Sequence, residues 1–232
     1  MILLSACALA YAGEGVFTVS SNGVRVIFAS ENFKQDAVLP NTDDFHLFGW
    51  SGRSRYHVTD FYGVAFVRAN GAYAGDFLDW GTLLADQGEW RTLTADEWTY
   101  VLTGRDNAAD LVGEATIDGQ KGMILLPDTS TLTIAQAEID WLKATEWGAV
   151  FLPYQGYRDG VDIVQEGEVG YYWTSTSTDS KKANYININN KTTASSDRYL
   201  GCSVRLVKPV CQVTVQVSVN DATMGTVIFK PQ

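Results

Sequence analysis

The most constraining feature of the sequence is a series of three short runs near its C-terminal end. They are residues 170–176 (GYYWTST), 183–190 (ANYININN) and 201–207 (GCSVRLV). In the middle run, Ile186 and Ile188 alternate with polar and aromatic side chains, and alternate residues of a strand point to opposite faces of a sheet. The pattern predicts a strand with one face in the core and a polar, aromatic face on the other side.

Local turn signals predict two β-hairpins nearer the N-terminus. Asn22-Gly23 lies between the alternating apolar runs 16–20 and 24–28, which is the strongest short-range signal for a hairpin. A second hairpin is expected for residues 114–117 and 122–126 around Asp118-Gly119, and the loop between these runs leaves the register open.

Two capping boxes predict the two main helices. Thr94 and Glu97 favour a helix over residues 95–103, with Gly104 as a left-handed stop and a buried face made of Trp98, Val101 and Leu102. Thr133 and Gln136 start the second helix, which ends before Gly148 and a buried strand over residues 149–152. Its apolar stripe is expected to be Ala135, Ile139 and Leu142.

Composition limits the classes of fold and function. With 46% hydrophobic residues the 232-residue chain can bury a sizeable core, and its short strands and two helices predict one main α+β domain. The formal net charge of −10 at pH 7 argues against a nucleic-acid partner, because phosphate binding depends on Lys and Arg. No stretch reaches the roughly 20 apolar residues of a membrane span. Residues 30–90 are expected to form long, structured loops.

The three cysteines lack the spacing of a zinc site. A disulfide between Cys202 and Cys211 and a pair of free thiols both remain open. Residues 4–7 (LSAC) resemble a bacterial lipobox, which would place a lipid anchor at Cys7. A clipped signal sequence or an ordinary first strand is the alternative for residues 1–14.

No catalytic residue, metal ligand or cofactor is assigned from the sequence. Acidic residues lie near two histidines, and other aspartates offer oxygen atoms for calcium, but neither group has a recognised spacing. The first group is His46, His57, Asp43, Asp44 and Asp60, and the second is Asp106, Asp110, Asp118 and Asp128.

Six motifs between residues 15 and 208 occur in a characteristic order. They are residues 47–50 (LFGW), 90–98 (WRTLTADEW), 148–153 (GAVFLP), 156–160 (GYRDG), 170–176 and 203–207 (SVRLV). Together they resemble the Fibrobacter succinogenes major paralogous domain family, which is common in Bacteroidetes. The resemblance implies a C-type lectin-like fold of the branch allied to the formylglycine-generating enzymes, and a secreted, cell-surface or phage-borne location.

Two further similarities concern the C-terminal part of the chain. Residues 209–232 are expected to be a strand tail or the start of a β-repeat module, because they resemble the opening of internalin-type B repeats. The Asn-, Tyr-, Ser- and Asp-rich stretch before residues 203–207 is similar to the variable region of proteins diversified by mutagenic retroelements. Such elements alter adenines, so Asn codons become Tyr, Ser or Asp codons.

A binding face is therefore predicted within residues 171–199. Tyr and Trp side chains supply rigid contact area, and Asn and Ser supply adaptable hydrogen bonds. The candidates are Tyr172, Trp173, Ser175, Ser177, Asp179, Asn184, Tyr185, Asn187, Asn189, Asn190 and Tyr199. The alternative interpretation is that Tyr172 and Trp173 are core residues and the asparagines belong to a solvated loop.

These observations predict a non-enzymatic domain that binds a protein or glycan ligand on another cell or surface. The alternative is a structural domain of the cell envelope without an external ligand. A formylglycine-generating oxidase would need a reactive cysteine pair, which Cys202 and Cys211 do not reproduce.

Overall fold

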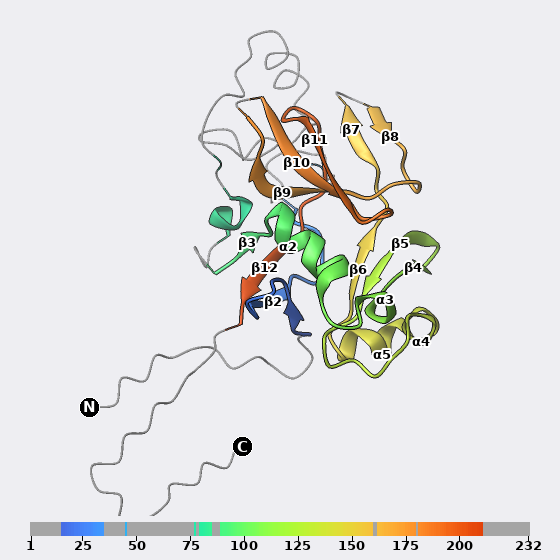
Figure 1. The fold of residues 1–232 in the computed structure, drawn as a ribbon. Helices are drawn as coiled ribbons and strands as arrows, with labels where there is room; N and C mark the ends of the chain where they lie inside the picture. Colours follow the sequence, from blue (N-terminus) through green and yellow to red (C-terminus); the bar gives the residue numbers. More distant parts are fainter. Residues whose placement is uncertain are drawn as a thin grey trace, which may run out of the picture. The chain divides into compact units, whose positions relative to one another are not determined.

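The computed structural model describes residues 15–34, 45, 77, 79–84, 89–159, 162–179 and 181–210. All of them belong to one compact unit, Ala10–Val210. In these residues the strands form four antiparallel sheets with short helices between them (Figure 1), so the domain is of the α+β class. Most of the expected loop region 30–90, the segment 1–14 and residues 211–232 lie outside the described residues.

The first sheet brings the beginning and the end of the described chain together. Its order is β1 (Phe17–Thr18), β2 (Arg25–Phe28), β12 (Leu206–Pro209) and β3 (Arg91–Thr92). The predicted first hairpin is confirmed, with Gly23 at a φ of 77° in its turn. β12 pairs with both β2 and β3, so residues far apart in sequence depend on one another for their backbone hydrogen bonds.

The second sheet contains the second predicted hairpin. Its strands are β4 (Val112–Ile117), β5 (Gln120–Leu125) and β6 (Val150–Pro153). Asp118 and Gly119 have φ values of 51° and 80°, as a two-residue hairpin turn of the primed type requires. The strands therefore run up to the turn, with Ile117 opposite Gln120, and the longer loop expected from the sequence is wrong.

The first predicted helix is confirmed, although its end differs. It consists of α2 (Ala95–Thr99) and a π-helical turn, η2 (Tyr100–Gly104). Both hydrogen bonds of the capping box form between Thr94 and Glu97. The predicted buried face of Trp98, Val101 and Leu102 is at most 1% exposed.

Gly104 does not adopt the predicted left-handed conformation. The helix instead widens at its end, where the Arg105 N–H donates to the carbonyl of Tyr100 at 3.0 Å. A Cβ atom at Gly104 would lie 2.8 Å from the Tyr100 ring. Glycine is therefore needed there for the close approach of this ring, and not for its φ angle.

The second predicted helix is divided in two. α4 (Ile134–Ile139) and α5 (Trp141–Glu146) are separated by Asp140, whose φ and ψ are −124° and 69°. The Asp140 carboxylate accepts a hydrogen bond from the Lys143 N–H at 3.2 Å, so this residue ends one helix and caps the next. The predicted capping box at Thr133 and the stop at Gly148, with a φ of 81°, are confirmed.

The predicted apolar stripe of this helix is wrong. Ile139 and Leu142 are 87% and 80% exposed, and Ala135 is exposed as well. Ala137 and Ala144 are the fully buried residues of α4 and α5. Ala135 and Ile139 share one face of α4, but α4 packs on β4 and β5 through Ile134 and Ala137, so that face is exposed. The break at Asp140 also interrupts the 3.6-residue period, so Leu142 of α5 does not continue the face of α4.

The remaining elements include two further sheets. β7 (Tyr157–Asp159) pairs with β8 (Asp162–Val164), and the other sheet has the order β11 (Thr192–Asp197), β10 (Lys182–Asn187), β9 (Tyr171–Ser177). A 3₁₀ turn, η1 (Trp80–Leu83), precedes β3, and the short helix α3 (Ala108–Leu111) precedes β4. Among the described residues, no helix is long and apolar enough to cross a membrane.

β9 lies between two hydrophobic clusters. Tyr172 belongs to the cluster that contains Trp98 and Ile186, whereas its neighbour Trp173 belongs to the cluster that contains Trp80 and Cys202. Figure 1 shows β9 and β10 beside α2, with which both strands are in contact. Both faces of β9 are therefore buried in this part of the strand.

A buried polar network connects the last strand region to earlier parts of the chain. The guanidinium of Arg205, a residue that is 2% exposed, donates to the carbonyl oxygens of Ala29 at 2.8 Å and Phe151 at 2.7 Å. It also donates to the Asn32 side-chain oxygen at 3.0 Å. Asn32 in turn donates to the Gln155 amide oxygen at 2.6 Å.

We expect Arg205→Met to lower the free energy of unfolding by about 3 kcal/mol, because one buried and two partly buried acceptors lose their donor. Urea unfolding followed by tryptophan fluorescence measures this change. Arg25→Met is the matched control, since Arg25 is exposed on β2 and its loss should change the free energy of unfolding by less than about 0.5 kcal/mol. Equal losses in the two variants would contradict a special role for Arg205.

Candidate functional site

The predicted binding segment folds as the three-stranded sheet β9–β10–β11. The alternation predicted for its middle run is confirmed, because Ile186 and Ile188 are fully buried while Tyr185 and Asn187 are partly exposed. Tyr185 lies opposite Trp173 of β9 and opposite Ala194 of β11. The face that carries Tyr185 therefore starts at a buried tryptophan and ends at an exposed strand.

β9 contains an irregularity beside this face. Three residues, 174–176, lie between the pairs that β9 forms with Tyr185 and Ala183, and they face only one residue of β10, Asn184. The Thr174 hydroxyl donates to the carbonyl of Asn184 at 2.8 Å and accepts from the Thr176 N–H at 3.1 Å. The Thr176 hydroxyl accepts from the first N–H group of α2, so the bulge attaches the sheet to this helix.

Three tyrosine rings, one from β7 and two from the β9–β10–β11 sheet, form a continuous row, which we call the tyrosine row. Tyr157 and Tyr171 stack with ring centroids 5.2 Å apart and an interplanar angle of 13°. The ring of Tyr185 lies 4.5 Å from that of Tyr171. Trp173 meets Tyr185 edge to face at 6.5 Å and closes the row on its buried side. All three tyrosines are partly exposed.

The environment of Tyr185 favours its neutral form. Burial, followed by the neighbouring Tyr171, raises the pKa of the Tyr185 hydroxyl well above its ordinary value. A hydrogen bond with the Tyr171 side chain contributes to this increase. Tyr185 therefore presents an uncharged ring and hydroxyl group at neutral pH.

β11 borders the tyrosine row with small side chains. In the described part of the chain it pairs with β10 alone, so it is an edge strand. Residues 192–195 are all exposed, and their sequence is Thr-Thr-Ala-Ser. A partner that contacts the tyrosine row from this side would meet a flat strand without long side chains.

The structure corrects the assignment of two predicted contact residues. Tyr172 and Trp173 are completely buried, in separate clusters. The Tyr172 hydroxyl donates to the carbonyl of Pro153 at 3.0 Å and so belongs to the interior. Composition indicated a contact surface here, but a strand covered on both faces buries consecutive residues.

Two of the predicted asparagines hold the backbone of a neighbouring turn. The Asn189 amide donates to the carbonyl of Glu168 at 2.6 Å, and its oxygen accepts from the Gly170 N–H at 2.8 Å. The Asn187 oxygen accepts from the Asn189 N–H at 3.1 Å. Both side chains are partly exposed, but their hydrogen bonds serve the entry to β9.

Three other predicted residues also have local partners. The Asn190 oxygen accepts from the N–H and hydroxyl of Thr192, and the Asn184 oxygen accepts from the Thr178 hydroxyl at 2.7 Å. The exposed Asp179 carboxylate accepts from the N–H groups of Lys181 and Lys182, which lower its pKa. These contacts are the usual ones of Asn and Asp in turns.

The last three candidates differ in accessibility. Ser177 is exposed at the end of β9, while Ser175 and Tyr199 are partly exposed. Sequence reasoning missed Tyr157, Tyr171 and the exposed residues of β11. The alternation of side chains along a strand could have identified Tyr171, because it lies two residues before Trp173 and so on the same face. The contribution of Tyr157 depends on a ring contact between separate sheets, for which the sequence contains no signal.

No metal centre forms among the residues that the structure describes, where no group of three or more His, Cys, Asp or Glu side chains could hold an ion. Asp128 instead pairs with the buried Arg105 at 3.0 Å and accepts from the Thr18 hydroxyl at 2.7 Å. Cys202 is a buried free cysteine, and burial raises its pKa. Other candidate residues, Cys7, Cys211, His46, His57, Asp43, Asp44 and Asp60, lie outside the described residues.

Comparisons with family models, with curated proteins and with solved structures found no match to this chain. The tyrosine row and β11 are therefore the features from which we infer a function.

We expect Tyr185→Phe to make the protein less sensitive to alkaline pH. A pKa that is raised in the folded state stabilises the fold below the ordinary value of 10.0, and this stabilisation is lost as the pH rises above it. The stability difference between wild type and variant should therefore shift in favour of the variant by up to about 1.4 kcal/mol per pH unit above about pH 10. Urea unfolding at a series of pH values measures it, and a constant difference would contradict the burial of this hydroxyl.

Proposed function

We propose that residues 15–208 form a C-type lectin-like domain of the family that the six motifs resemble. The positions of motif residues support a shared scaffold, because they are needed for packing. Trp98 is fully buried, and Arg205 forms the centre of the polar network. A Cβ atom at Gly170 would lie 2.6 Å from the Ile188 side chain, so this glycine is required for close packing.

The domain acts as a non-enzymatic binding module of a secreted, surface or phage-borne protein. The observation that carries this proposal is the tyrosine row beside the exposed edge strand β11. Partly exposed tyrosines offer rigid contact area at a small entropic cost, and adjacent small polar side chains let a ligand approach closely. The sheet that carries them is fixed from behind by the buried side chains of Ile186 and Tyr172.

The ligand is a protein or a glycan on another cell or surface, held by ring contacts and hydrogen bonds. Such a surface needs no charged partner, because it consists of tyrosine rings and the small side chains of residues 192–195. Recognition by a rigid sheet also favours an interface that forms with little rearrangement of the backbone.

We expect Ala194→Arg to reduce ligand binding at least about tenfold, which corresponds to 1.4 kcal/mol. Ala194 is exposed and lies opposite Tyr185, so an arginine there would cover the tyrosine row. Retention of the labelled protein on glycan arrays and on intact bacterial cells measures binding. Ala135→Arg is the matched control, since Ala135 is exposed on α4. Equal retention of both variants and wild type would contradict the proposed surface.

Diversification by a retroelement is a further part of this proposal. It requires that variable codons fall where a side chain can change without loss of the fold. Exposed and partly exposed positions such as Ser177, Tyr185 and Ser195 meet this condition, whereas Trp173 and Ile186 do not.

Sequencing this locus in many related isolates tests the diversification. We expect replacements to concentrate at the accessible positions of residues 175–199, while Trp173, Ile186, Ile188 and residues 204–207 stay constant, because replacing a buried side chain destabilises the core. An even distribution of replacements over the chain would contradict diversification. The Ala194→Arg experiment would still test the binding proposal.

A second candidate is a structural domain of the cell envelope that packs against neighbouring domains. The observation that favours it is a set of exposed apolar side chains within residues 139–147, where Ile139 of α4, Leu142 of α5 and Trp147 after α5 are 87%, 80% and 49% exposed. Exposed apolar side chains that lie together often mark a protein contact. If this candidate is right, Ala194→Arg should be retained on arrays and cells to the same extent as wild type. Ala135→Arg should instead change how the domain assembles with its neighbouring domains.

A further inference from the structure

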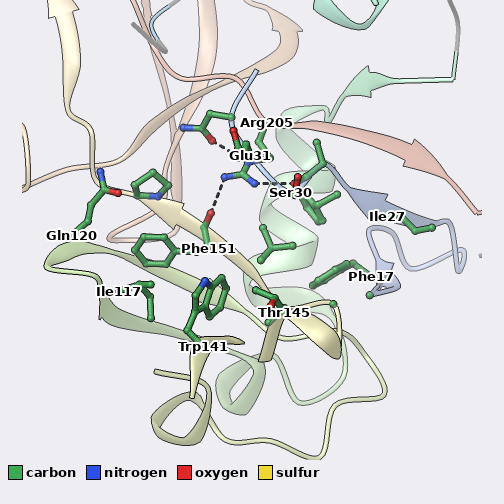
Figure 2. Close-up of a pocket in the computed structure, with 18 of the residues that line it drawn as sticks. Phe17, Ile27, Ser30, Glu31, Ile117, Gln120, Trp141, Thr145, Phe151 and Arg205 are labelled. Atoms are coloured by element: carbon green, nitrogen blue, oxygen red, sulfur yellow. Dashed lines mark hydrogen bonds between the residues drawn. The ribbon is translucent and has the colours of Figure 1, made fainter. Parts of the chain in front are cut away.

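A cleft separate from the tyrosine row lies between the first hairpin and the β5–β6 side of the domain (Figure 2). Its volume is about 760 Å³, which is within the range of small-molecule sites. One wall contains residues of β2 and the segment after it, and the other contains β6, α5 and the turn between β4 and β5. None of the residues of the tyrosine row or of β11 lines it.

Arg205 defines the end of the cleft shown at the top of Figure 2. Its guanidinium donates to the carbonyl of Ala29 on one wall and to that of Phe151 on the other. It therefore holds the two walls at a fixed separation. A site that is fixed before binding pays little conformational entropy when a ligand enters.

Aromatic rings form one corner of the cleft. Trp141 of α5 and Phe151 of β6 are both partly exposed, and their rings meet edge to face at 5.9 Å and 65°. Figure 2 shows the two side chains next to each other on the same wall. Flat apolar rings of this kind offer a face on which the C–H groups of a ring-shaped ligand can lie.

Polar side chains surround this corner. Gln120 and Asp118 lie at the β4–β5 turn, Thr145 lies on α5, and Ser30 and Glu31 lie on the opposite wall. They combine an amide, two carboxylates and two hydroxyls, and they offer both donors and acceptors of hydrogen bonds. An entirely apolar ligand would remove these groups from water without replacing their hydrogen bonds.

The charges of the cleft do not favour an anion. Arg205 donates to Ala29, Phe151 and Asn32, and the other cation of the lining, Lys34, lies 3.7 Å from the Glu31 carboxylate. Asp118 adds a further acidic group. We propose that this cleft binds a neutral saccharide, whose ring stacks on the Trp141 and Phe151 corner while its hydroxyls bond to Gln120 and Asp118.

The test is a titration of the whole chain with neutral mono- to trisaccharides built from glucose, galactose, mannose, fucose and N-acetylglucosamine. Tryptophan fluorescence and calorimetry should reveal saturable binding of at least one of them, with a dissociation constant of about 1 mM or tighter. Gln120→Ala should weaken that binding about three- to tenfold, since an exposed turn residue can be truncated without unfolding the sheet. Trp141→Phe should weaken it as well.

Ala194→Arg is the control that separates the two sites, because it blocks the tyrosine row and leaves the cleft untouched. Saccharide affinity should be the same in this variant as in wild type. The proposal is overturned if no member of the panel saturates the protein, or if Ala194→Arg abolishes binding while Gln120→Ala and Trp141→Phe retain it. Failure here would not affect the binding proposed for the tyrosine row, which the arrays test independently.

Discussion

The hydrogen bonds of Arg205 hold together parts of the chain that local interactions alone would not join. A guanidinium that is 2% exposed is tolerable only when its donors meet good acceptors, and two of those acceptors are backbone carbonyls of separate strands or loops. Through Asn32 and Gln155 the same network reaches the Ser203 hydroxyl, which donates to the Gln155 oxygen at 2.9 Å. The pairing of β12 with β2, the width of the cleft and the position of β9 all depend on this arrangement.

Features determined by neighbouring residues could be predicted from the sequence. The turns at Asn22-Gly23 and Asp118-Gly119, and the capping boxes at Thr94 and Thr133, depend on contacts between residues at most a few positions apart. The alternation of buried and partly exposed side chains around Ile186 could also be predicted, because one face of β10 is buried and the other is partly exposed.

Features determined by distant contacts could not be predicted. Tyr172 and Trp173 resemble contact residues in composition, and only the position of β9 between two clusters makes both of them core residues. Ile139 is exposed because α4 packs through Ile134 and Ala137, and Leu142 is exposed on α5, beyond the break at Asp140. The asparagines of the predicted face are mainly occupied with turns, which is a role that residue type alone does not distinguish from recognition.

The unequal surroundings of β9 and β11 have an evolutionary consequence. A strand with packed neighbours on both faces accepts few alternative amino acids, whereas an edge strand with exposed side chains accepts many at little energetic cost. The two strands are separated only by β10, so positions that tolerate replacement and positions that do not lie in the same sheet. The surface chemistry of β11 can therefore change by single replacements, without compensating changes elsewhere in the molecule.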